Sequence, residues 1–99
     1  MDEVKTFIEN YDSDSMVSDC TYIHVDDFEI SKNNEETLKL IVSKLEEISK
    51  IEITAKYIKT EYDDWPSVDF KLKNSNKTGI IRLVYDRRSY LYWFVEIVA

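Results

Sequence analysis

The segment Tyr90–Val98 constrains the fold more than any other, because it is apolar in both sets of alternating positions of a β-strand. One set holds Leu91, Trp93, Val95 and Ile97, and the other holds Tyr90, Tyr92, Phe94 and Val98, interrupted only by Glu96. Successive side chains of a strand point to opposite faces of its sheet, so such a strand is normally covered on both faces. A single helix can cover only one of them.

The segment Glu35–Lys50 supplies that helix. Its apolar residues recur at helical spacing, which predicts one buried stripe: Leu38, Ile41, Val42, Leu45 and Ile48. Asn33 is suited to cap the first turn, and Glu36 follows three residues later, a variant of the capping-box spacing. A shorter helix over Asp2–Asn10 is also compatible with the spacing of its apolar residues.

The remaining segments alternate in polarity and predict strands. These are Thr21–Ile30, with a bulge or bend at Asp26–Asp27, then Ile51–Thr60, Val68–Lys73, Ile80–Tyr85 and Tyr90–Val98. In Ile51–Thr60 we expect Ile51, Ile53, Ala55 and Tyr57 to face inward. Short connections favour an antiparallel meander. We therefore predict one α+β domain over residues 1–99, with one amphipathic helix on an antiparallel sheet of four to five strands in the order β-α-β-β-β-β.

The second face of this sheet needs a cover of its own. Besides aromatic residues of Tyr90–Val98, we expect it to carry Lys56, Ile58, Lys71, Lys73, Ile80, Arg82 and Val84. One interpretation is that the acidic amino-terminal segment folds over this mixture of bases and aromatics. The other is that a partner, or a second copy in a homodimer through the last strand, packs there, since exposed aromatic patches seldom go unused.

Charge is distributed very unevenly along the chain. Residues 1–36 hold eleven carboxylates against two lysines, a local charge of −9, whereas residues 37–99 carry +2. Asymmetry of this kind informs about partners rather than about fold. An acidic surface attracts a basic one, and the surfaces that grip nucleic acid are commonly basic. The sequence therefore predicts a basic protein partner and argues against direct nucleic-acid binding.

Composition bounds the setting in which the protein works. A single cysteine, Cys20, excludes an internal disulfide and fits a reducing compartment. No apolar run approaches the length of a membrane span, and Met1–Asp2–Glu3 lacks the apolar region of a signal peptide, so we expect a cytoplasmic protein. Scarce glycine, proline and alanine beside plentiful Lys, Ile, Asn and Tyr point to an AT-rich genome, such as that of a low-GC bacterium or its phage.

Catalytic and metal-binding patterns are weak. Asp69–Phe70–Lys71 has the D-x-K form of metal nucleases, with Asp63 or Asp64 upstream, but any alternating strand produces it by chance. Cys20 and His24 would stand about 13 Å apart on one strand, too far for a catalytic dyad. Asp12–Ser15 begins like a calcium loop but lacks the central glycine and the terminal glutamate. We expect no enzyme activity, no cofactor and no metal.

The candidate binding residues are acids and aromatics. The acids are Asp12, Asp14, Asp19, Asp26, Asp27 and Glu29. Carboxylates two residues apart on a strand stand about 6.6 Å from each other and can present negative charge as a phosphate backbone does. Asp63 and Asp64, followed directly by Trp65, are further candidate binding residues. Trp65 and the last-strand pair Tyr90 and Tyr92 are candidate apolar contacts.

Three functions follow from this surface. The first is a small acidic intracellular inhibitor that occludes the nucleic-acid-binding surface of an enzyme, as phage anti-CRISPR and anti-restriction proteins do. The second is a bacterial immunity protein that neutralises a cognate nuclease toxin. The third is a nucleic-acid-binding module that uses the basic and aromatic sheet face, an interpretation that the net charge of −7 disfavours.

Overall fold

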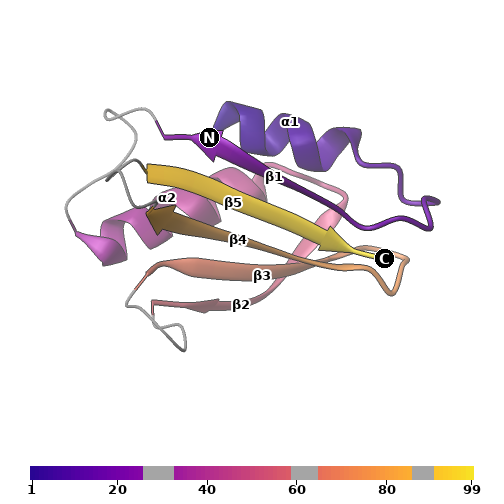
Figure 1. Cartoon of the computed structure of the whole chain (residues 1–99). Coiled ribbons are helices and arrows are strands. Elements are labelled where there is room, and N and C mark those ends of the chain that lie inside the picture. The colour runs from indigo at the N-terminus through magenta and orange to yellow at the C-terminus, as the bar shows by residue number, and fades with distance from the viewer. Residues whose placement is uncertain (26–32, 59–64, 86–90) are drawn as a thin grey trace.

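The computed structural model describes residues 1–25, 33–58, 65–85 and 91–99, and its elements form one α+β fold (Figure 1). The elements are α1 (Asp2–Asn10), β1 (Asp19–His24), α2 (Asn34–Glu46), β2 (Ile51–Tyr57), β3 (Ser67–Leu72), β4 (Thr78–Tyr85) and β5 (Leu91–Val98). The five strands make one antiparallel sheet in the order β1-β5-β4-β3-β2. The predicted fold class and element order are confirmed, including the short helix in front.

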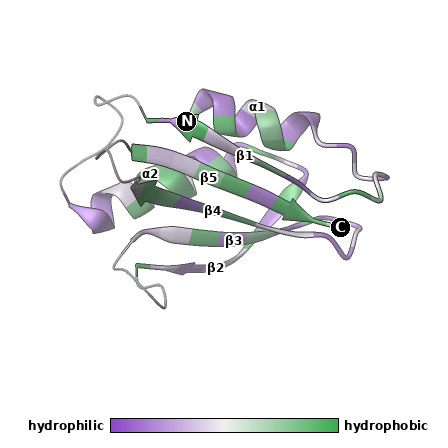
Figure 2. Cartoon of the chain, viewed as in Figure 1, coloured by the Kyte–Doolittle hydropathy of each residue, from purple (hydrophilic) through white to green (hydrophobic). Residues whose placement is uncertain are grey.

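The last strand lies inside the sheet, which explains why it is so apolar. β5 pairs with β1 on one side and with β4 on the other, so that Trp93 stands beside Ile23 and Leu83. Trp93, Val95 and Ile97 are fully buried in the core. Figure 2 shows β5 as one of the most hydrophobic ribbons of the molecule. Because the backbone of β5 is paired on both sides, a homodimer through this strand could use only its side chains.

Helix α2 forms as its sequence predicts. The Asn33 side chain accepts a hydrogen bond from the Glu35 amide at 2.8 Å, which satisfies a backbone donor of the first turn. Ile41, Leu45 and Ile48 are buried, while Leu38 and Val42 pack against the core from its margin. The helix ends at Glu46 instead of Lys50, because the amides of Glu47 and Ile48 bond to carbonyls three residues back and tighten the last turn.

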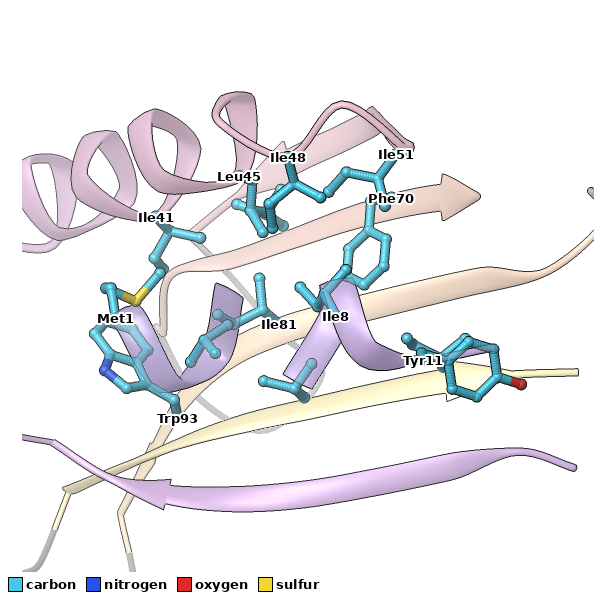
Figure 3. Close-up of a cluster of buried hydrophobic side chains, with 14 of the residues drawn as sticks. Met1, Ile8, Tyr11, Ile41, Leu45, Ile48, Ile51, Phe70, Ile81 and Trp93 are labelled. Carbon is cyan, nitrogen blue, oxygen red and sulfur yellow. The ribbon is translucent and has the colours of Figure 1, made fainter. Parts of the chain in front are cut away.

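Helix α1 packs on the same face of the sheet as α2. Val4 and Ile8 are fully buried and belong to the one core cluster that also contains Ile41 and Leu45. Figure 3 shows Ile41 and Leu45 of α2 directed toward the sheet, in the cluster that also contains Met1, Ile81 and Trp93. The interpretation that the amino-terminal segment covers the second face is therefore wrong for α1, because the apolar stripe of α1 is buried in the core on the other face. Residues 26–32 of that segment lie outside the described residues.

Strand β2 contains an irregularity that the alternation did not reveal. Ile53 pairs with Phe70 and Ala55 pairs with the adjacent Asp69, so Thr54 is an extra residue in the ladder. From Ala55 onward the side chains exchange faces. The predicted inward positions of Ala55 and Tyr57 are therefore wrong: both lie on the second face, where Ala55 is exposed. Lys56, predicted on the second face, instead pairs with Val68 on the face that the helices cover.

The β3–β4 connection leads into the only glycine in the chain, Gly79, which is the second residue of β4. Asn74 adopts φ 61°, a left-handed conformation that asparagine tolerates better than most residues, and the Leu72 amide bonds to the Lys77 carbonyl at 3.0 Å. Gly79 pairs with Phe70 on β3, and the Phe70 ring occupies the place that the Cβ atom of any other residue at position 79 would take. Gly79 thus leaves the space that the Phe70 ring occupies.

Candidate functional site

Helices α1 and α2 both cover the same face of the sheet, and neither helix packs on the second face. This second face, here called the open face, is defined by the strand registers. Its described members are Cys20, Tyr22, His24, Glu52, Ala55, Tyr57, Ser67, Asp69, Lys71, Thr78, Ile80, Arg82, Val84, Tyr92, Phe94, Glu96 and Val98. The face that the sequence predicts as needing a cover is thus the one that the helices leave open.

Aromatic rings gather at the β1–β5 side of the open face. The Tyr22 ring lies 5.0 Å from the Phe94 ring and 6.5 Å from the Tyr92 ring, measured between centroids. The His24 ring meets the Tyr92 ring edge-on at 5.6 Å. Cross-strand aromatic pairs of this kind stabilise neighbouring strands. The same rings form a continuous apolar surface, which includes the predicted contact residue Tyr92.

The β2–β4 side of the open face is polar. Lys71 pairs with Glu52 at 3.6 Å, and the Arg82 guanidinium lies 5.1 Å above the Phe94 ring. Among its described members the face holds three carboxylates against one lysine and one arginine. It therefore carries no excess of positive charge, as a nucleic-acid-binding face would.

Ser67 on β3 and Arg82 on β4 each bury one polar group. Ser67 Oγ and Arg82 Nε are buried without a hydrogen-bond partner, although the two residues are cross-strand neighbours. The Tyr57 hydroxyl donates to Asp69 Oδ1 at 3.3 Å. Burial and, to a smaller extent, the Asp69 charge and this hydrogen bond raise the pKa of Tyr57 above its ordinary value of 10.0.

The connection between α1 and β1, residues 11–18, is fixed to the body of the protein at several points and is here called the acidic loop. The Tyr11 hydroxyl donates to the Val17 carbonyl at 2.7 Å. Lys50 Nζ donates to the carbonyls of Glu9 and Tyr11, and Lys77 Nζ donates to that of Ser13. The Ser18 hydroxyl accepts from the Ala99 amide at 2.9 Å, which ties the loop to the end of β5.

The acids in and beside this loop differ from three acids near the contact between α1 and α2. Asp2, Glu9 and Glu47 each lie within 4.0 Å of Lys5 or Lys44. In contrast, Asp12, Asp14 and Asp19 are exposed, and none of the ion pairs within the described part of the chain involves them. Asp12 and Asp19 accept only backbone amides, those of Asp14 and Cys20. Their charge is directed to solvent.

Exposed apolar side chains lie next to these acids. Met16 is 92% exposed, Val17 is 70% exposed and Tyr22 is 64% exposed. Sequence reasoning missed Met16 and Val17, although an apolar pair inside the polar stretch Tyr11–Asp19 was the available signal. Asp12, Asp14, Asp19, Met16 and Val17, which are exposed and close in the sequence, form the candidate contact surface. Tyr22 lies on the open face, on the other side of β1 from Asp19.

The other predicted contact residues have different outcomes. The Trp65 side chain is partly buried and packs against the core, so it acts as a cover for the core more than as an exposed anchor. Asp26, Asp27, Glu29, Asp63, Asp64 and Tyr90 lie outside the described residues. Of the six predicted loop and strand acids, Asp12, Asp14 and Asp19 lie within the described residues and are exposed, and Tyr92 lies with Tyr22 on the open face.

The described residues offer little for catalysis. No group of three or more His, Cys, Asp or Glu among them could hold a metal ion. Cys20 and His24 stand on the same strand four residues apart, about 13 Å along the chain. Asp69 is engaged by Tyr57, and Lys71 by Glu52. No helix in the described part is long and apolar enough to cross a membrane.

Comparisons with protein-family models, curated proteins and solved structures found no match to this chain. Its function is therefore argued from its own surface.

Proposed function

We propose that this protein is a small acidic inhibitor that binds and occludes the basic nucleic-acid-binding surface of a partner enzyme. One observation carries the proposal: Asp12, Asp14 and Asp19 are exposed, belong to none of the ion pairs among the described residues, and flank the exposed Met16 and Val17 in the sequence. Exposed acids outside those ion pairs are available to a cationic partner.

The two kinds of side chain would have different tasks. Carboxylates steer a basic partner toward the surface and raise the association rate, an effect that salt weakens. Exposed apolar side chains near the centre of a contact surface lower the dissociation rate once water is excluded. Because the acidic loop is tied down by Lys50, Lys77 and Ala99, little ordering entropy would be lost on binding.

The proposed setting is the cytoplasm, that of the host if a phage encodes the protein. The AT-rich codon usage implied by the composition fits a low-GC bacterium or its phage. An immunity protein that neutralises a cognate nuclease toxin would use the same physics. Gene neighbourhood separates the two: a toxin gene directly upstream favours immunity, and a phage operon favours inhibition of a host enzyme.

Inhibition assays on basic nucleic-acid enzymes test the proposal directly. The panel contains CRISPR nucleases, restriction nucleases and nuclease toxins of low-GC bacteria, each assayed for cleavage of its DNA or RNA substrate with and without the protein. We expect one class to be inhibited, with an affinity that falls as salt rises. Inhibition of none of them, or a complex insensitive to salt, would contradict the proposal.

A matched pair of charge variants locates the contact. The test variant replaces Asp12, Asp14 and Asp19 by asparagine, which retains the two side-chain acceptors of backbone amides. The control replaces Glu3, Glu35 and Glu46 by glutamine and reaches the same net charge. We expect the test variant alone to lose most of the inhibition. Equal losses would mean that net charge matters and this surface does not.

The nucleic-acid-binding alternative has one supporting feature, the cluster of aromatic rings on the open face, since bases stack on such rings. The charge of that face opposes it, because Lys71 is paired with Glu52 and carboxylates outnumber bases. A gel-shift assay with single-stranded DNA and RNA decides between them. Binding that weakens with salt and with Phe94→Ala would favour the alternative over inhibition.

A further inference from the structure

The two edges of the sheet differ in how well they are protected against pairing with another strand. The β2 edge is interrupted by the extra residue Thr54 and carries the exposed charges of Glu52 and Lys56. β1 instead pairs with β5 through six consecutive residues without a break. After Asp19, the stretch Cys20–His24 contains no proline and no Lys, Arg, Asp or Glu, the residues that natural edge strands use against association.

No strand of the described part of the chain pairs with the outer side of β1, and the backbone of β1 presents Tyr22 to this edge. The Val25 amide donates to the Leu91 carbonyl at 3.0 Å, so Val25 faces β5, and so do the alternate residues Ile23 and Thr21. The amide and carbonyl of Tyr22 therefore point away from the sheet. The Cys20 amide also points outward but already donates to Asp19 Oδ1 at 2.9 Å.

The side chain of Tyr22 adds an exposed aromatic surface to the same edge. Its ring packs against those of Phe94 and Tyr92 on one side, yet 64% of its surface remains exposed. The Tyr22 ring has aromatic neighbours on the β5 side, and none of the described rings packs against it on the outer side of β1. Within the described part of the chain, no other strand presents a large apolar side chain as exposed as this one at an edge.

We propose that two copies of this chain pair through β1, antiparallel and about a two-fold axis at Tyr22, to form one continuous ten-stranded sheet. In this register Tyr22 lies opposite Tyr22 of the second copy, where the two residues exchange backbone hydrogen bonds. Cys20 lies opposite His24 of the second copy. The two aromatic clusters then join into one across the new pair of strands.

The charges of β1 favour a second copy over a charged strand from another protein. Between Cys20 and His24 the strand offers no charge that would select a basic segment. In the register about Tyr22, Asp19 lies opposite Val25 of the second copy, and the two Asp19 carboxylates are about 20 Å apart. A register centred on Cys20 would bring these carboxylates within about 7 Å of each other, which like charges oppose.

Sedimentation equilibrium over a concentration series tests the dimer. We expect a monomer–dimer equilibrium that shifts toward dimer as salt rises, because each copy carries a charge of −7 and salt screens their repulsion. Tyr22→Pro removes the outward amide without removing a ladder bond and should abolish the dimer. Val98→Ala, on the open face of β5 and away from the edge, is the control and should leave it intact.

A crosslink tests the register. His24→Cys, combined with the native Cys20, should give a disulfide-linked dimer under mild oxidation, because opposed residues of a hydrogen-bonded pair lie about 5.5 Å apart between Cα atoms. The native protein, with Cys20 alone, should not crosslink. Within one copy the two cysteines would be about 13 Å apart, so the bond could form only between copies.

Several outcomes would overturn the proposal. These are a monomer at every concentration and salt, a dimer that survives Tyr22→Pro, and crosslinking through Cys20 alone. If Tyr22→Pro does not fold, Tyr22→Lys retains the backbone and places a protective lysine on the edge, and it must dissociate the dimer instead. The dimer should strengthen with salt, whereas the complex with a basic enzyme should weaken, so each proposal can fail without the other.

Discussion

At the scale of single residues, Gly79 shows how one side chain can decide the packing of another. A Cβ atom built on Gly79 would overlap the end of the Phe70 ring and lie 2.9 Å from the Glu96 carbonyl oxygen. Phe70 is only 1% exposed, so its ring cannot swing into solvent. Glycine is required here for space, since the backbone of Gly79 does not adopt a positive φ.

We expect Gly79→Ala to lower the free energy of unfolding by about 1–3 kcal/mol, the usual cost of overpacking a core. The gain from restricting the unfolded chain, about 0.4–1 kcal/mol, is smaller. Urea denaturation measures the change, with Thr78→Ala at the exposed neighbouring position as the control. In Phe70→Leu, which shortens the obstructing ring, the same alanine should cost less. An alanine cost that is unchanged by Phe70→Leu would disprove the steric explanation.

Tyr57 makes stability depend on alkaline pH. Its pKa is raised in the folded protein by burial and by Asp69, so the folded state holds the phenol proton more tightly than the unfolded state does. The resulting stability is fully present below the ordinary value of 10.0 and is lost as the pH rises through the folded pKa. Urea midpoints measured on either side of pH 10.0 should therefore fall less steeply for Tyr57→Phe than for the native protein. Parallel curves would contradict this account.

At the scale of elements, the amino-terminal cap of α2 is a local feature that sequence and structure agree on. The Asn33 side chain accepts from the Glu35 amide at 2.8 Å. Asn33→Ala should lower the free energy of unfolding by about 1 kcal/mol, because that donor loses its partner. Asn33→Asp keeps an acceptor and adds a charge that favours a helix amino terminus, so thermal unfolding should show native stability or better. Equal losses in both variants would exclude the cap as the cause.

The elements that sequence predicts well are those with local causes. The cap at Asn33 and the stripe through Ile41 and Leu45 each depend on neighbours three or four residues away, and the structure confirms them. The extra residue Thr54 leaves no such signal, because the alternation around it continues unbroken in the sequence. Only pairing with β3 shows that Ala55 and Lys56 exchange faces.

At the scale of the whole molecule, the arrangement of layers depends on contacts between distant segments. Tyr90–Val98 indicates a strand covered on both faces, but the alternation does not say which segment covers which face. The core had room for both helices, since Val4 and Ile8 of α1 join Ile41 and Leu45 of α2 on one side. The candidate site follows from this choice: because α1 packs with α2 on the core side, neither helix covers the open face. Of the acids predicted to bind, Asp12, Asp14 and Asp19 lie within the described residues, where they are exposed.

The distribution of ion pairs separates acids that stabilise the fold from acids that do not. Lys5 and Lys44 lie between Asp2, Glu9 and Glu47 and offset their charge where α1 meets α2. Within the described residues the acids of the candidate contact surface form no such ion pair, although Lys50 and Lys77 bond to carbonyls of the same loop. In a chain of net charge −7 these acids repel the other carboxylates. Their presence therefore opposes folding slightly, as is common where a surface serves binding.

Removing these charges should consequently stabilise the protein. The variant with asparagine at positions 12, 14 and 19 should unfold at a higher urea concentration than the native protein at low salt, and the difference should shrink as salt screens the repulsion. A variant with glutamine at positions 9 and 47 should not gain stability in the same way, because it also loses attraction to Lys5 and Lys44. If the asparagine variant were the less stable of the two at low salt, the carboxylates would be structural, and a role for them in binding would lose its physical basis.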